Sequence, residues 1–204
     1  DAAMACASRY SVPIWAHTRT KELLDGKVRV DRFLHDGDRL DLGPSPADGR
    51  PWLLDVLHTP GHASGHLAFF DPLYRILLAG DMISTVTSMV ISPPDGNIPD
   101  YLASLRRLRE LPTRILMPAH GAISTEATQL IDAALEHRAK RERQLLDGLK
   151  DTPIGVDDLT AQLYRGTPEN LMRFARAQVL AGLLKLEQEG RAEQVGGEAW
   201  RIRA

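Results

Sequence analysis

The chain has very little cysteine, with Cys6 as the single one among its 204 residues. An internal disulfide is therefore excluded, and we expect Cys6, which lies among small residues, to pack rather than to react. No apolar run approaches the length of about 18 residues that a membrane span needs, so a membrane protein is not expected. The net charge of −2 provides no electrostatic attraction toward nucleic acid or membrane. Also lacking is a Ser/His/Asp or Cys/His constellation, which argues against a protein nucleophile.

Three motifs place metal-ligand residue types at the ends of apolar segments. They are LHTPGH, which ends at His62, LLAGD, which ends at Asp81, and ILMPAHG, which contains His120. In each motif an expected strand leads through a tight turn with Gly or Pro to the ligand type. Any one of them alone is equally typical of an ordinary turn or of a satisfied histidine. Together, two imidazoles and a carboxylate converging over a sheet would suit Zn²⁺, Fe²⁺ or Mn²⁺.

The string TPGHASGH from Thr59 to His66, followed by the other two motifs, resembles the metallo-β-lactamase superfamily of metal-dependent hydrolases. The resemblance covers roughly residues 1–124. It implies that His62 binds a first metal, that Asp81 bridges two metals and that His120 binds the second. It implies Zn²⁺ as the cofactor, two ions in the complete enzyme, with Fe or Mn as alternatives. His66 is not a ligand in the family pattern.

His66 and Asp81 are the candidate catalytic residues beyond metal binding alone. Asp81 would set the spacing of the two metals. His66 would support the loop or the substrate side, and we hypothesise that it orients the substrate or donates to it. The expected chemistry is attack by a metal-activated hydroxide on an electrophilic carbonyl or phosphorus.

One large family motif, His-x-His-x-Asp-His, does not occur in this chain. The resemblance implies that it lies upstream of Asp1, so we expect this to be the C-terminal part of a longer enzyme; a naturally truncated, metal-free relative is the alternative. Stable zinc sites use three or four protein ligands, whereas this chain supplies about one per metal and the bridge. We therefore expect the isolated chain to be metal-poor and nearly inactive. Its seven histidines are at positions 17, 35, 58, 62, 66, 120 and 137.

The predicted fold is α/β with two parts. Residues 1–123 are expected to form the C-terminal part of a metallo-β-lactamase αβ/βα sandwich, and residues 124–204 a long helix and a small winged-helix domain. Thr18 and Asp157 are expected to cap helices. The predicted helices span residues 2–10, 18–24, 98–110, 124–149, 156–164 and 168–188. The predicted strands span residues 12–17, 27–34, 52–57, 66–70, 75–79, 115–117, 191–195 and 199–202.

The order of three helices and a hairpin at the C-terminal end is that of a winged helix. It also resembles the small domain of one superfamily branch, which includes mitochondrial β-lactamase-like endoribonucleases. Residues 125–204 hold 12 Lys and Arg against 13 Asp and Glu, so a basic face for a duplex is lacking. Arg173 and Arg176 are the nearest candidates for one. We favour a packing or substrate-gating role for this domain.

Three functional readings stay open at this point. The first is a hydrolase of small thioesters, esters or lactones, the second a single-strand endoribonuclease, and the third a non-catalytic partner-binding fragment. Residues 82–97 either help to wall a substrate pocket or form an ordinary connection. We expect a small-molecule substrate, no membrane partner, RNA as a disfavoured partner and a cytoplasmic location; a homodimer stays open. The abundance of Arg, Ala and Leu is typical of a GC-rich bacterial genome.

Overall fold

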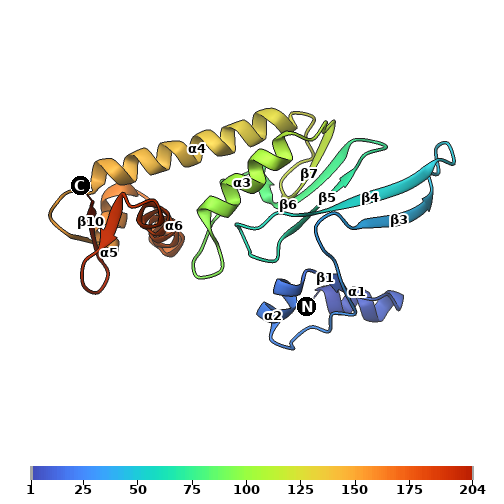
Figure 1. Cartoon of the computed structure of the whole chain (residues 1–204), viewed down its shortest axis with the longest axis horizontal. Helices are drawn as coiled ribbons and strands as arrows, with labels where there is room; N and C mark the ends of the chain where they lie inside the picture. Colours follow the sequence, from blue (N-terminus) through green and yellow to red (C-terminus); the bar gives the residue numbers. More distant parts are fainter. Residues whose placement is uncertain (1, 204) are drawn as a thin grey trace.

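The computed structural model describes residues 2–203, which form three parts (Figure 1). A central sheet carries helices α3 (Ile98–Arg109) and α4 (Ala127–Gly148) on one face. A small N-terminal unit lies on the side of the sheet away from these helices, and a C-terminal domain is attached at the far end of α4 (Figure 1). The predicted α/β class is confirmed.

The central sheet has the strand order β3-β4-β5-β6-β7. Strands β3 to β6 are antiparallel neighbours, and β7 joins β6 in parallel. A parallel pair requires a crossover connection, and here residues 85–97 and α3 supply it. The bounds are β3 (Arg39–Pro44), β4 (Pro51–His58), β5 (Leu67–Asp71), β6 (Ile76–Ser84) and β7 (Ile115–His120).

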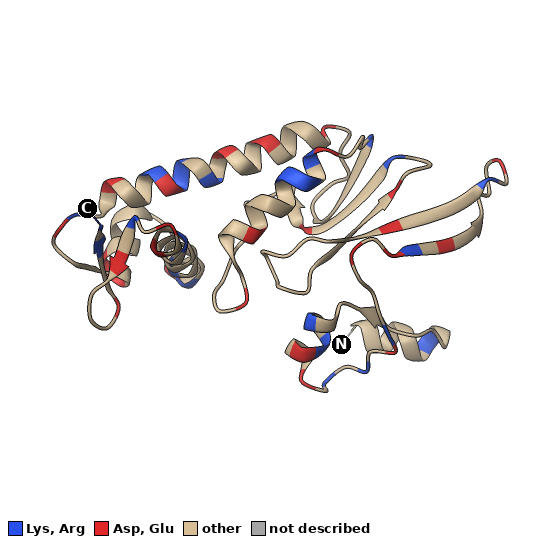
Figure 2. Ribbon diagram, in the orientation of Figure 1, with Lys and Arg blue, Asp and Glu red and all other residues tan. Residues whose placement is uncertain are grey.

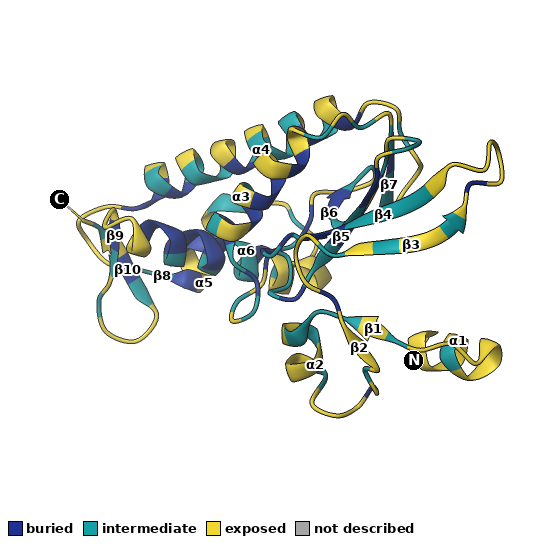
Figure 3. Ribbon diagram, turned by 45° about the vertical axis from the view of Figure 1, so that its right-hand side comes forward, coloured by how far each residue is buried: buried dark blue, intermediate teal, exposed yellow. Residues whose placement is uncertain are grey.

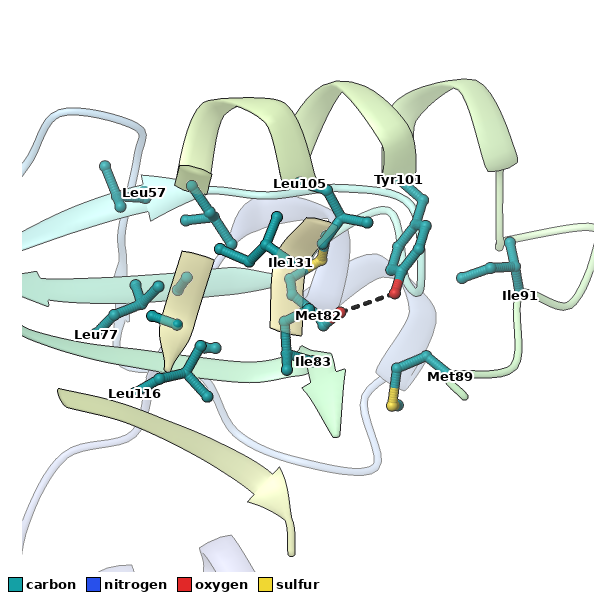
Figure 4. Packing of buried hydrophobic residues seen from close by; sticks show 14 of the residues in the cluster. Leu57, Leu77, Met82, Ile83, Met89, Ile91, Tyr101, Leu105, Leu116 and Ile131 are labelled. Atoms are coloured by element: carbon teal, nitrogen blue, oxygen red, sulfur yellow. Dashed lines mark hydrogen bonds between the residues drawn. The ribbon is translucent and has the colours of Figure 1, made fainter. Parts of the chain in front are cut away.

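The two faces of this sheet differ in burial. In β6, Leu77 is fully buried beneath the helices, whereas its neighbour Leu78 is 39% exposed on the opposite face. Leu105 of α3 and Ile131 of α4 belong to the same core as Leu77 (Figure 4). Tyr101 of α3 packs in this core and donates a hydrogen bond from its hydroxyl to the carbonyl of Met82 at 2.8 Å. As expected from the sequence, Tyr101 is a packing residue.

The N-terminal unit departs from several predictions. It contains α1 (Ala2–Tyr10), β1 (Trp15–Ala16), α2 (Thr18–Leu24) and β2 (Arg32–Phe33). The two strands are much shorter than predicted because they pair only with each other among the described residues. Cys6 is exposed and not buried, since α1 has no buried residue. The cap of α2 is His17, whose Nδ1 accepts from Arg19 N at 3.3 Å, and Thr18 is the first helical residue.

The C-terminal domain packs helices against a small sheet of order β8-β10-β9. Trp200 is nearly fully buried in its core with Leu159 and Leu183 (Figure 3). The predicted cap at Asp157 is wrong: α5 begins after Gly155, and the Asp157 carboxylate pairs with Arg176 instead. The bounds are β8 (Ile154–Gly155), α5 (Val156–Leu163), α6 (Glu169–Gln188), β9 (Ala192–Gln194) and β10 (Ala199–Ile202).

Helix α4 joins the two cores. Its first half contributes Ala127 and Ile131 to the core under the central sheet, and its end contributes Leu145 to the C-terminal core. It starts later than predicted because Ser124 pairs with Leu116 in an isolated bridge. Basic and acidic side chains alternate along its outer surface (Figure 2). Between residues 2 and 203, no helix has the combined length and apolar character needed to cross a membrane.

Candidate metal centre

The three predicted ligands are brought together by neighbouring elements. His62 lies in the loop after β4, Asp81 lies within β6, and His120 is the last residue of β7. The prediction that Asp81 follows the end of its strand is wrong, because β6 continues to Ser84. The strand instead shifts register around Gly80, which has φ +54°, and such a bulge re-aims the next side chain.

The Asp81 carboxylate lies between the two imidazoles. Its Oδ2 is 3.8 Å from His62 Nε2, and its Oδ1 is 3.2 Å from His120 Nε2. Oδ1 is buried and has no hydrogen-bond partner. A buried carboxylate oxygen without a partner is costly, so a cation at this position would satisfy it. Within residues 2–203, no three His, Cys, Asp or Glu side chains are grouped closely enough to hold a metal by themselves.

His62 is oriented by a backbone carbonyl. Its Nδ1 lies 2.8 Å from the carbonyl oxygen of Val90, so Nδ1 carries the proton and donates. Nε2 is then left with a free lone pair on the side facing Asp81. This is the arrangement typical of a metal-ligating histidine, whose other ring nitrogen is held by an outer partner. The sequence does not reveal Val90 as that partner, because the contact is made by the main chain.

His66 is engaged at both ring nitrogens. Nε2 accepts from the backbone N–H of Asp81 at 3.0 Å, so Nδ1 carries the proton and donates to Thr59 Oγ1 at 2.8 Å. Burial, aided by the proximity of His62, lowers the pKa of His66 to about 4, which keeps the ring neutral. The hypothesis that His66 donates to the substrate is therefore wrong for this geometry, and the expected loop-supporting role fits it.

The histidine loop is tied to residues 82–97. The Ser64 hydroxyl donates to Asp95 Oδ1 at 2.5 Å, and the Ser64 N–H donates to Asp95 Oδ2 at 3.1 Å. Gly61 approaches α3 so closely that a Cβ atom there would lie 2.2 Å from Tyr101 Cα. The sequence alone does not single out Asp95, although the Pro-Pro-Asp-Gly string around it is typical of a structured turn.

Residues 83–89 line a cavity of about 240 Å³ with α3 and α4. Thr85 links this segment to the metal-ligand loop, since its N–H donates to the His120 carbonyl at 3.2 Å. Met89 is buried, and so is Ile91 just beyond it. The expectation that residues 82–97 wall a pocket is therefore compatible with their position, and they also carry the partner carbonyl of His62.

Comparison with known families agrees with this arrangement. The model of the metallo-beta-lactamase superfamily matches residues 2–120, which is more than half of the chain. The chain belongs to this superfamily. Residues 156–200 match the beta-lactamase associated winged helix domain, which confirms the C-terminal fold prediction. The superfamily commonly binds divalent metals such as zinc or iron.

Two curated relatives illustrate the range of these proteins. A beta-lactamase-like protein 2 homolog of Caenorhabditis elegans is 30% identical over 183 residues, covering 89% of this chain and 57% of its own length. An acyl-coenzyme A thioesterase of Gallus gallus is 36% identical over 97 residues, covering 46% of this chain and 32% of its own length. The chain spans about half the length of the first curated relatives it matches.

Two solved structures have the same fold. A metallo-beta-lactamase family protein from Thermus thermophilus has a TM-score of 0.74 at 24% identity, covering 94% of this chain and 72% of that one. A protein determined in a di-iron-bound form has a TM-score of 0.52 at 26% identity, covering 63% of this chain and 67% of that one.

Proposed function

We propose that this chain carries one part of a two-metal hydrolase site that acts on thioesters, esters or lactones. The observation that carries the proposal is the Asp81 carboxylate, whose two oxygens face His62 and His120 separately and whose buried Oδ1 lacks a hydrogen-bond partner. A carboxylate placed between two imidazoles in this way suits a bridge between two cations. His62 and His120 would each hold one of them.

Two metal ions in such a site supply Lewis acidity, which generates a nucleophile from water near neutral pH and stabilises charge on the substrate oxygen. The chain's own residues position these groups. Val90 keeps the Nε2 lone pair of His62 available, and His66 holds the backbone of Asp81 in place. Zn²⁺ is the proposed metal. Iron is supported as an alternative by the di-iron-bound relative, and manganese by the ligand types.

A thioester is the substrate class with most support. Curated relatives include the acyl-coenzyme A thioesterase of Gallus gallus and an atrochrysone carboxyl ACP thioesterase of Aspergillus fumigatus. The alternative of RNA cleavage is disfavoured by the charge of the C-terminal domain. One of its two candidate contact residues, Arg176, is paired with Asp157 and Glu198. A non-catalytic role as a partner-binding fragment remains the third reading.

Zinc titration of the chain followed by NMR of the histidine side chains tests this proposal. We expect zinc to shift the His62 and His120 signals together, and Asp81→Asn to weaken the effect strongly. His35, which is exposed and distant in sequence from the three ligands, provides a matched control as His35→Ala. Zinc that leaves both His62 and His120 unperturbed would overturn the proposal. Elemental analysis of protein purified without chelators gives the resident metal, and thioester hydrolysis then separates the first reading from the others.

A further inference from the structure

Arg138 is a buried cation in the middle of α4. It is 7% exposed, and no carboxylate of residues 2–203 forms an ion pair with it. Its guanidinium instead donates to the carbonyl of Met89 and, at 2.6 Å, to Gln178 Oε1. It also lies over the ring of Tyr101, 5.0 Å from the ring centroid. Burying a charge among neutral groups is costly, so an apolar residue of similar size would fill this space at lower cost.

The contacts of Arg138 hold one peptide carbonyl from two helices. Met89 O accepts from Arg138 and also from Gln178 Nε2, at 3.2 Å in the second case. Because Gln178 also accepts from Arg138, the two side chains and the carbonyl form a closed set of hydrogen bonds. Gln178 belongs to α6, in the C-terminal domain. The planar fork of an arginine can reach two acceptors at once in this way, which a lysine cannot.

The next carbonyl along the chain is the one that orients the metal ligand. Val90 O accepts the proton of His62 Nδ1 at 2.8 Å. Consecutive peptide planes are related by only two soft dihedral angles, so anchoring the Met89 carbonyl restricts where the Val90 carbonyl points. The path therefore runs from α4 and α6 through Met89 and Val90 to the imidazole of His62.

We propose that Arg138 and Gln178 are positioning residues for His62, and that the winged-helix domain braces the metal centre through them. This inference rests on the proposed function, since it assigns His62 a ligand role. It gives the domain a task that needs no nucleic acid. The acceptor set explains why a guanidinium is present where no acid balances it.

The test compares the full chain with Arg138→Met and Gln178→Ala, and with Arg141→Met as a matched control. Arg141 lies one turn further along α4 and contacts Tyr164 and Gln144, not the Met89 carbonyl. Long-range proton–nitrogen NMR reports which ring nitrogen of His62 carries the proton, without any metal. We expect the Nδ1–H tautomer in the parent and in Arg141→Met, and a mixture of tautomers in Arg138→Met. Zinc affinity should fall about tenfold in Arg138→Met, as for other outer partners of metal ligands.

The outcomes are separable. An unchanged His62 tautomer and unchanged zinc affinity in a folded Arg138→Met protein would overturn the inference. If circular dichroism shows that this variant is unfolded, Gln178→Ala decides, since it removes one donor to Met89 and one acceptor of Arg138. We expect a smaller shift toward the other tautomer there, and no shift overturns the inference. Failure of zinc to perturb His62 and His120 in the parent would sink the proposed function, while the tautomer still tests the bracing.

Discussion

Gly61 and Tyr101 lie against each other so tightly that a Cβ atom at Gly61 would come within 2.2 Å of Tyr101 Cα. Gly61 also has φ +134°, a backbone conformation that other residues rarely adopt. This contact presses the histidine loop, which carries His62, onto the first turn of α3. The spacing of the loop from the helix layer is therefore set by a residue without a side chain.

Replacing Gly61 by Ala should destabilise the protein by about 2–4 kcal/mol, from backbone strain and a clash that only main-chain movement can relieve. Urea unfolding measures the change. Gly37→Ala is the control, since Gly37 has φ +82° and open space around it. It should cost about 1 kcal/mol, from strain alone. Equal costs for the two variants would show that the close approach to Tyr101 is not a constraint.

Removal of the Tyr101 hydroxyl should leave a buried carbonyl unsatisfied. The hydroxyl donates to Met82 O at 2.8 Å, and Tyr101 is 1% exposed. We expect Tyr101→Phe to lower the free energy of unfolding by about 1–3 kcal/mol. Tyr10 is 64% exposed, so Tyr10→Phe should have almost no effect in the same unfolding experiment. A Tyr101→Phe protein as stable as the parent would contradict this role of the hydroxyl.

His66 should matter for stability before it matters for catalysis. His66→Ala removes the acceptor of the Asp81 N–H and the donor to Thr59, and it opens a space in a partly buried site. We expect a loss of about 2–4 kcal/mol by denaturant unfolding, together with weaker zinc binding as Asp81 moves. His35→Ala, at an exposed position, should stay within about 0.5 kcal/mol of the parent. Weaker zinc binding at unchanged stability would instead support a direct role for His66.

The stability of the chain should fall in mild acid partly because of His17. Burial lowers the pKa of His17, and the rings of His58, stacked at 4.1 Å, and His35 lower it further. A depressed folded-state pKa means that the stabilisation is present above the unfolded pKa of about 6.5 and is lost as the pH falls through the folded value.

His17→Asn tests this pH dependence, because Asn does not titrate and can still cap α2. Urea unfolding at several pH values between about pH 7.5 and pH 5 should show a smaller drop in stability for His17→Asn than for the parent. Parallel pH profiles for the two proteins would exclude His17 as a source of the effect.

The chain should not bind single-stranded RNA, even at low salt. Its C-terminal 80 residues are nearly neutral in charge, and Arg176 is already paired with two carboxylates. Fluorescence anisotropy with a labelled RNA at about 50 mM salt measures this, because phosphate contacts are strongest there. Binding that weakens steeply with added salt would favour the endoribonuclease reading.

Several parts of the molecule followed from local patterns. The apolar stripe of α3 and the Gly-rich turn of the final hairpin each predicted an element close to its observed bounds. Cys6 and the strand at residues 12–17 were predicted less well. Both lie in the N-terminal unit, where β1 pairs only with β2 and α1 buries no residue in the described chain. Burial and strand length depend on what neighbours an element, which its own residues do not specify.

By itself the sequence determined the family, the order of the elements and the identity of His62, Asp81 and His120 as candidate ligands, because each depends on residue type and spacing. Tertiary structure alone decided how these residues meet. It placed the imidazoles at opposite oxygens of Asp81, occupied both nitrogens of His66 and linked Arg138 to the carbonyl beside Val90. These contacts join distant segments, often through main-chain carbonyls. A carbonyl is common to every residue, so no local pattern marks the one that a fold will use.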